Sequence, residues 1–276
     1  MEGILAYLLA ALLYGAVAAY YWSTRAVAAP ASAPAVARPV PAWQPHVILL
    51  PLGVHGYSLA ESLFGPDGLY LGVGSAVSAI VFLAILVYWA GSRLYSMATL
   101  HTLLAPVAVV ASLLPAVLPA SHPLPNTDAP AFKFHLLLAL LAYSLFTIAA
   151  LHAVLMAFME KRLHQAARSA LFSDFPPLLS MERLLFRIIG AGFVLLTLTL
   201  ASGIVFSEEV FGTPLQFTHK TLFGIVSWVI YGALLGGRRL YGWRGRVAVR
   251  WTLAGFLALL LAYVGSKFVL EVILGR

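Results

Sequence analysis

The chain has 276 residues, of which 62% are hydrophobic and only 10% are charged, and its formal net charge is +7. Soluble globular domains carry about a quarter charged residues, so this composition excludes an ordinary water-soluble domain and indicates an integral membrane protein. The chain contains no cysteine, which excludes disulfides, thiolate metal sites and cysteine nucleophiles.

Apolar segments long enough to cross the hydrocarbon core of a bilayer occur eight times along the chain. Backbone amides in hydrocarbon must be paired within their own segment, so each segment is expected to be a helix. The predicted fold class is therefore all-α, a polytopic membrane helix bundle that forms one domain over residues 1–276. The expected helices are Ile4–Trp22, Val47–Phe64, Leu69–Trp89, Met97–Leu118, Phe132–Glu160, Met181–Phe206, Thr218–Leu235 and Val247–Ile273.

The first apolar segment also resembles a signal peptide, because the run Ile4–Tyr21 is followed by an AxA-like VAAP at Val27–Pro30. Cleavage is the alternative reading of this segment. No basic residue precedes the run, and its length suits a spanning helix, so we expect it to be helix 1 (residues 4–22). A low-complexity Ala/Pro-rich loop (23–46) then leads to the remaining helices between 47 and 273.

Basic residues are distributed unequally between the two expected faces of the membrane. Lysine and arginine gather in cytoplasmic loops, so the richer face is predicted to be cytoplasmic and both termini to lie outside the cytoplasm. The net charge then reflects topology and contact with lipids of the inner leaflet, not nucleic-acid binding. The richer face is expected to carry 13 of the 17 basic residues: Arg25, Arg38, Arg93, Lys161, Arg162, Arg168, Arg183, Arg187, Arg238, Arg239, Arg244, Arg246 and Arg250.

Two histidines stand beside lysines at the expected outer starts of helices. His135 follows Lys133 by two residues, and His219 directly precedes Lys220. Imidazole is a good ligand for haem iron, and a lysine or a helix N-terminus favours an anion such as a haem propionate. The pattern predicts an outer haem site with His135 and His219 as the iron ligands. The alternative it leaves open is that each histidine caps its helix at the membrane interface.

Three further histidines, His55, His101 and His152, fall within expected membrane spans. Ionisable residues at that depth are costly and usually functional. As a set they suggest a second, deeper ligand site or a path for the cofactor, although the residues do not determine which two would pair. The alternative is that each is a neutral imidazole that forms hydrogen bonds with a neighbouring helix.

Motifs of common enzyme classes do not occur in this sequence. There is no Ser/His/Asp nucleophile motif, no phosphate-binding glycine loop and no HExxH. The pair Gly72 and Gly74 lies in an apolar segment, where glycine favours close packing of helices. We therefore expect binding or transfer of a ligand and no catalysis by this chain alone.

Several segments resemble the cytochrome c assembly protein family of the CcsA/CcmC type. In FHLLLALLAYSL (134–145) a tyrosine, Tyr143, follows His135 by eight residues, as in that family. YSLAESL (57–63) resembles an outer-facing family segment that ends in Glu-Ser-Leu. From residue 218 onward the chain resembles the last two helices of the family, most clearly at WRG (243–245) and GSKF (265–268).

The resemblance implies a membrane protein that handles haem, with His135 as an outer axial ligand. The tryptophan-rich WWD signature of the family is absent, and GTPLQFTHKTLF stands in its place. A second outer histidine after the last helix is also missing. These departures argue against a haem-ligase activity and point to the short, eight-helix HemX/YpjD-like branch. The place of His219 as the second ligand is our inference and does not follow from the family.

The sequence thus predicts a multi-pass protein of the bacterial inner membrane that binds or relays haem. We expect it to support cytochrome c maturation or haem homeostasis, with other maturation proteins as possible partners. The competing prediction is a cofactor-free permease or regulatory membrane subunit in which the histidines are structural.

Overall fold

The computed structural model describes residues 2–26, 43–93, 101–120, 122–124, 127–164, 177–207 and 219–265. Its regular structure is almost entirely helical, which confirms the predicted all-α bundle. The helices are α1 (Glu2–Ala26), α2 (Leu49–Leu63), α3 (Val73–Gly91), α4 (His101–Val117), α5 (Pro130–His164), α6 (Leu178–Val205), α8 (His219–Tyr241) and α9 (Arg246–Leu260), with a 3-10 turn η1 (Gln44–His46) and a π-helical turn η3 (Leu261–Gly265).

Six of the described helices are long and apolar enough to cross a membrane: α1, α3, α5, α6, α8 and α9 with its continuation to Tyr263. Two of the predicted spans are shorter in the described residues. α2 has 15 residues, and the apolar part of α4 covers Leu103–Val117. The predicted start of the fourth span and the end of the eighth fall partly outside the described residues.

The third helix begins later than its hydropathy predicts. Leu69, expected to be its first residue, instead pairs with Phe64 in a two-stranded hairpin of β1 (Phe64–Gly65) and β2 (Gly68–Leu69). Gly68 has a φ of 133°, a conformation that glycine adopts readily, and the Leu69 carbonyl accepts a hydrogen bond from the Leu124 amide. These backbone contacts hold the segment in the hairpin, and α3 starts only at Val73.

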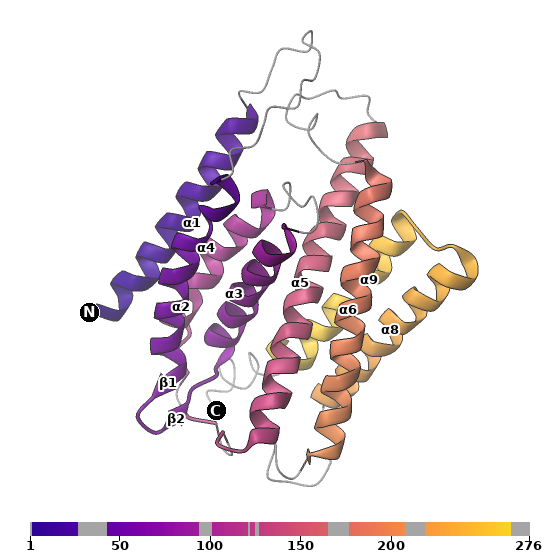
Figure 1. Cartoon of the computed structure of the whole chain (residues 1–276). Helices are drawn as coiled ribbons and strands as arrows, with labels where there is room; N and C mark the ends of the chain where they lie inside the picture. Colours follow the sequence, from indigo (N-terminus) through magenta and orange to yellow (C-terminus); the bar gives the residue numbers. More distant parts are fainter. Residues whose placement is uncertain are drawn as a thin grey trace.

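Two groups of buried apolar side chains form the core. One lies between α1, α2, α3 and α4 and includes Tyr14 and Ile85, both 0% exposed. The other lies between α5, α6, α8 and α9 with parts of α3 and α4, and its Phe146 and Tyr231 rings stack with centroids 3.9 Å apart. In Figure 1 the α1–α2 side and the α6–α8 side of the bundle are joined through α3 and α5.

The bundle has two distinct ends. The C-terminal ends of α1 and α5 and the start of α6 lie at the top in Figure 1, while the hairpin, the start of α5 and the end of α6 lie at the bottom. We call the first the basic end, because it carries exposed arginines such as Arg183, and the second the hairpin end. Helix directions therefore agree with the predicted grouping of basic residues, while the cytoplasmic orientation of the basic end stays a prediction.

The predicted close packing at Gly74 joins α3 to the end of α4. A Cβ atom built on Gly74 would lie 2.5 Å from the carbonyl oxygens of Leu114 and Leu118. Backbone atoms cannot move aside as a flexible side chain can, so the two segments approach this closely only at a glycine.

We predict that Gly74→Ala lowers stability by about 1–3 kcal/mol, because the new methyl group must separate α3 from α4. The matched control is Gly53→Ala, since a Cβ atom there meets nothing within 4 Å. Thermal unfolding in detergent measures both variants. Equal melting temperatures for the two variants would contradict this packing.

Candidate functional site

His135 lies in the second turn of α5, at the hairpin end, and packs against α6. Its Nδ1 atom is 2.9 Å from Ser202 Oγ, and a Cβ atom on Gly203 would lie 3.2 Å from His135 Cε1. The Ser202 hydroxyl donates its proton to the Thr199 carbonyl at 3.0 Å. If the Ser202 hydroxyl proton stays on the Thr199 carbonyl, Ser202 Oγ accepts from His135 Nδ1–H, and this tautomer carries the imidazole lone pair on Nε2.

His219 and Lys220 begin α8 at the same end of the bundle. The two helices α6 and α8 run antiparallel, with Gly224 opposite Leu200 and the Trp228 indole donating a 2.9 Å hydrogen bond to Thr197. Extending this register toward the start of α8 brings His219, which is exposed, to the last turns of α6. Both predicted iron ligands therefore lie at one end of α6.

The two predicted ligands approach α6 on different faces. His135 contacts Ser202, whereas the start of α8 lies along the face that carries Thr197 and Leu200. At about 100° per residue, Ser202 lies about 160° around the α6 axis from Leu200 and about 140° from Thr197, so the two sets fall on well-separated faces of α6. The structure thus places His135 and His219 at one end of α6 but on separate sides of that helix, and no described contact joins them.

The two lysines differ in their surroundings. Lys133 is exposed in the first turn of α5. The Lys220 ammonium lies over the Tyr263 ring, 5.8 Å from its centroid, and the Tyr263 ring is 6.5 Å from that of Tyr143. Tyr143 in turn donates a 2.8 Å hydrogen bond to the Leu259 carbonyl. Aromatic contacts therefore connect Lys220 on α8 to α5 through the π-helical turn at the end of α9.

His55 is completely buried between α1, α2 and α3. Its Nδ1 lies 3.3 Å from the Tyr14 hydroxyl and its Nε2 lies 2.8 Å from the Ser78 hydroxyl. The Tyr14 and Phe82 rings meet the imidazole edge-on. Both nitrogens of His55 thus have a polar partner on another helix, as a neutral structural imidazole requires.

His152 lies in the other core group and is 4% exposed. Its Nε2–H donates a 2.9 Å hydrogen bond to the Met181 carbonyl on α6. His101 begins α4, but its side chain lies outside the described residues. His55 and His152 therefore have different neighbours, and no described contact joins them into one site.

A search of the described residues finds no group of three or more His, Cys, Asp or Glu side chains that could hold a metal ion. Haem iron differs from a bare ion, because the porphyrin supplies four ligands and the protein supplies only the axial ones. The predicted haem site with His135 and His219 needs only two protein ligands and stays a prediction.

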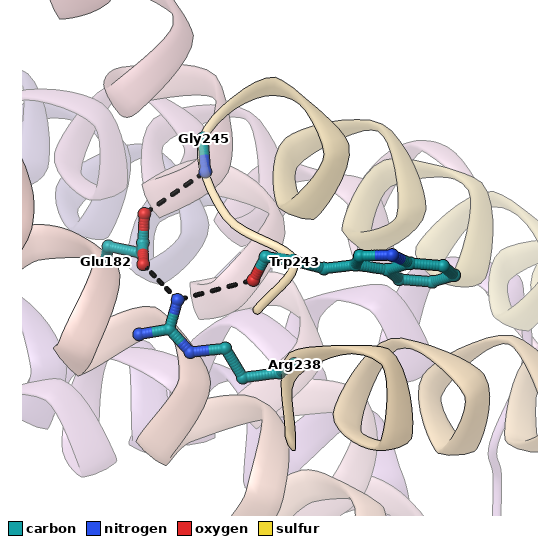
Figure 2. A network of polar contacts seen from close by, with 4 residues as sticks. All are labelled: Glu182, Arg238, Trp243 and Gly245. Carbon is teal, nitrogen blue, oxygen red and sulfur yellow. Dashed lines mark hydrogen bonds and ion pairs between the residues drawn. The ribbon is translucent and has the colours of Figure 1, made fainter. Parts of the chain in front are cut away.

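Sequence reasoning missed a polar network at the basic end, which Figure 2 shows. Glu182 is 6% exposed in the first turns of α6. One carboxylate oxygen pairs with Arg238 at the end of α8, and the other accepts a 3.1 Å hydrogen bond from the Gly245 amide. Arg238 also donates to the Trp243 carbonyl at 3.3 Å. Two features of the sequence could have indicated this network: Glu182, an acidic residue inside an apolar segment, and the WRG motif at 243–245.

The shape of the α8–α9 turn depends on two glycines, Gly245 within the turn and Gly237 near the end of α8. Gly245 has a φ of 59°, a left-handed conformation, and its amide faces Glu182. A Cβ atom on Gly237 would lie 2.3 Å from the Trp243 ring. The turn therefore folds the WRG segment back onto α8 and presents its backbone to α6.

Comparison with known proteins gives one family and several relatives. The family model described as "Cytochrome C assembly protein" matches residues 43–274. "Inner membrane protein YpjD" of Escherichia coli K12 is 38% identical over 144 residues, which are 52% of this chain and 54% of the relative. An uncharacterized 28.8 kDa protein of Azospirillum brasilense is 36% identical over 159 residues, 56% of this chain and 58% of that protein.

A third relative is "Cytochrome c biogenesis protein CcsA" of Prochlorococcus marinus AS9601, which is 40% identical over 88 residues, 32% of this chain and 28% of that protein. The chain thus spans about half the length of the first two relatives and less of the third. No solved structure matches.

We predict that Glu182→Gln destabilises the protein by about 3 kcal/mol, because Arg238 then loses its counter-charge in a largely buried position. The matched control is Glu160→Gln, which breaks the Arg246–Glu160 pair of 2.8 Å at a much more exposed arginine and is expected to cost at most about 1 kcal/mol. Chemical or thermal unfolding in detergent compares the two. A smaller loss for Glu182→Gln than for Glu160→Gln would contradict the assignment.

Proposed function

Because the chain belongs to the cytochrome c assembly protein family, whose model matches residues 43–274, we propose that it binds or relays haem at the hairpin end of the bundle. It does so in support of cytochrome c maturation or haem homeostasis. The observation that carries the proposal is the hydrogen bond between His135 Nδ1 and Ser202 Oγ, which fixes the orientation of the imidazole.

The setting of this function is the membrane. The chain is a multi-pass inner-membrane protein, with six helices of spanning length and a relative named as an inner membrane protein. The printed name of the Prochlorococcus relative assigns that protein to cytochrome c biogenesis. In this chain the same role would bring haem, as cargo, to partners that carry out later steps of cytochrome c maturation.

The residues at the hairpin end fit haem chemically. His135 and His219 supply imidazoles from α5 and α8, and an imidazole on each side of the iron completes its coordination. Lys133 and Lys220 supply positive charge for the two propionates, assisted by the N-terminal ends of their helices. The cation–π contact with Tyr263 holds the Lys220 ammonium beside α9.

In this proposal one ring nitrogen of His135 binds the iron, and Ser202 holds the other ring nitrogen by a hydrogen bond. Such partners fix the tautomer and the ring orientation, and their loss commonly lowers metal affinity by about 10- to 100-fold. Here the partner stands on α6, so ligand geometry depends on the packing of α5 against α6. Relaxed packing at Gly203 would let the imidazole rotate.

The predicted deeper site from His55, His101 and His152 stays a prediction. To bind iron, His55 would have to leave Tyr14 or Ser78. His152 would offer the iron Nδ1 or give up its bond to the Met181 carbonyl. His135 and His219 lie at one end of the bundle, beside Lys133 and Lys220, and are therefore the first site to test.

We predict that the purified protein, loaded with hemin, has a strong Soret band that His135→Ala and His219→Ala each weaken, since each removes one axial ligand. The matched control is His122→Ala, a change at an exposed loop histidine, and it should leave the band intact. Hemin titration followed by absorbance measures all four proteins. A protein that takes up no hemin would favour the cofactor-free permease or regulatory subunit.

We further predict that Ser202→Ala weakens hemin binding about tenfold and shifts the Soret maximum, because His135 loses the acceptor that orients it. Ser202→Thr keeps a hydroxyl and should restore the wild-type spectrum. Thr197→Val is the matched control, since the Thr197 hydroxyl on the same helix contacts Trp228 and not His135. Wild-type affinity in Ser202→Ala would show that Ser202 does not position the ligand, without excluding His135 itself.

A further inference from the structure

Three arginines surround the Glu182 network at the basic end of the bundle. Each is next in sequence to one residue of the network, which consists of Glu182, Arg238 and Gly245. Arg183 follows Glu182 on α6, Arg239 follows Arg238 on α8, and Arg244 precedes Gly245 in the turn. Neighbouring Cα atoms are about 3.8 Å apart, so the network fixes all three backbones around one point. We call Arg183, Arg239 and Arg244 the corner arginines.

The corner arginines are exposed, and their charge is not neutralised by the described residues. Two carboxylates described at this end are already engaged, Glu182 with Arg238 and Glu160 with Arg246. No described acidic side chain pairs with any of the three. Within the part of the chain that the structure describes, the corner therefore carries three exposed arginines, on three segments, that no acidic side chain pairs with.

Exposed apolar side chains lie on the same segments. Leu240 and Tyr241 are 78% and 75% exposed at the end of α8, and Leu179 is 58% exposed in the first turn of α6. The centroid of the Tyr241 ring lies 6.2 Å from that of Trp243, so two aromatic rings lie together at the end of α8. Tyrosine and tryptophan at helix ends mark the boundary between headgroups and acyl chains.

From these observations we infer that the corner arginines form a binding site for an anionic phospholipid with two phosphates, diphosphatidylglycerol. Guanidinium groups bind phosphate oxygens in pairs, and basic positions between membrane helices recognise acidic headgroups. The positive charge of three arginines is closer to the negative charge of a headgroup with two phosphates than to that of a headgroup with one. Leu179 and Leu240 provide apolar surface for the acyl chains, which free phosphate would not use.

The Glu182 network gives this site its rigidity. The Gly245–Glu182 bond attaches the turn that carries Arg244 to α6, and the Arg238–Glu182 pair attaches the end of α8, which carries Arg239, to α6. Lipid binding would in turn draw α6, α8 and the turn together. The lipid therefore stabilises the end of the bundle opposite the predicted haem site, and the inference does not depend on haem binding.

The test is native mass spectrometry of the delipidated protein in detergent with added diphosphatidylglycerol, phosphatidylglycerol or phosphatidylcholine. Wild-type protein should retain diphosphatidylglycerol best. The triple variant R183Q/R239Q/R244Q should bind it about a hundredfold more weakly, since each arginine near a membrane surface contributes about a factor of five. The matched control is R93Q, which removes another exposed arginine of the basic end and should bind as wild type does.

Several outcomes would overturn the inference. Equal retention of diphosphatidylglycerol by the triple variant and the wild type would remove the site, and equal retention of all three lipids by the wild type would make the binding non-specific. Displacement of the lipid by millimolar inorganic phosphate would assign the corner to free phosphate. Melting temperatures without lipid check the fold of the triple variant, and R239Q alone, expected to lose about fivefold, replaces it if it does not fold.

Discussion

Polar contacts between apolar helices are the constraint on which the arrangement of this bundle depends. Lipid tails are as apolar as leucine, so hydrophobicity holds the helices in the membrane without choosing their neighbours. Hydrogen bonds that cross between helices and close contacts at small residues make that choice. His55 joins α1 and α3 to α2, His152 joins α5 to α6, and Ser227 donates to the Gly255 carbonyl to join α8 to α9 at 2.9 Å.

These contacts also determine where the proposed haem ligands lie. α6 packs against both α5 and α8. His135 on α5 bonds to Ser202 on one face of α6, and Trp228 on α8 bonds to Thr197 on another. The starts of α5 and α8 therefore both lie near the last turns of α6, on separate faces of that helix. A ligand site built in this way responds to any shift of α6, which couples ligand geometry to helix packing.

The basic end is organised by charge in a different way. Glu182 brings α6, the end of α8 and the α8–α9 turn to one carboxylate, while Arg246 and Glu160 attach the start of α9 to α5. Both of these acids are engaged in ion pairs, and Arg183, Arg239 and Arg244 are exposed. The same two ion pairs that fasten the helices thus leave a positively charged corner at the membrane surface.

By itself, the sequence determined the membrane class, the helical segments, the asymmetry of the basic residues and the candidate histidines, because hydropathy, charge and residue type are local properties. It erred at Leu69, whose backbone pairs with Phe64 in a hairpin that hydropathy does not reveal. Only the tertiary structure supplied the partners: Ser202 lies 67 residues from His135, and Arg238 lies 56 residues from Glu182. Such pairs depend on how distant helices pack, and no local pattern encodes that packing.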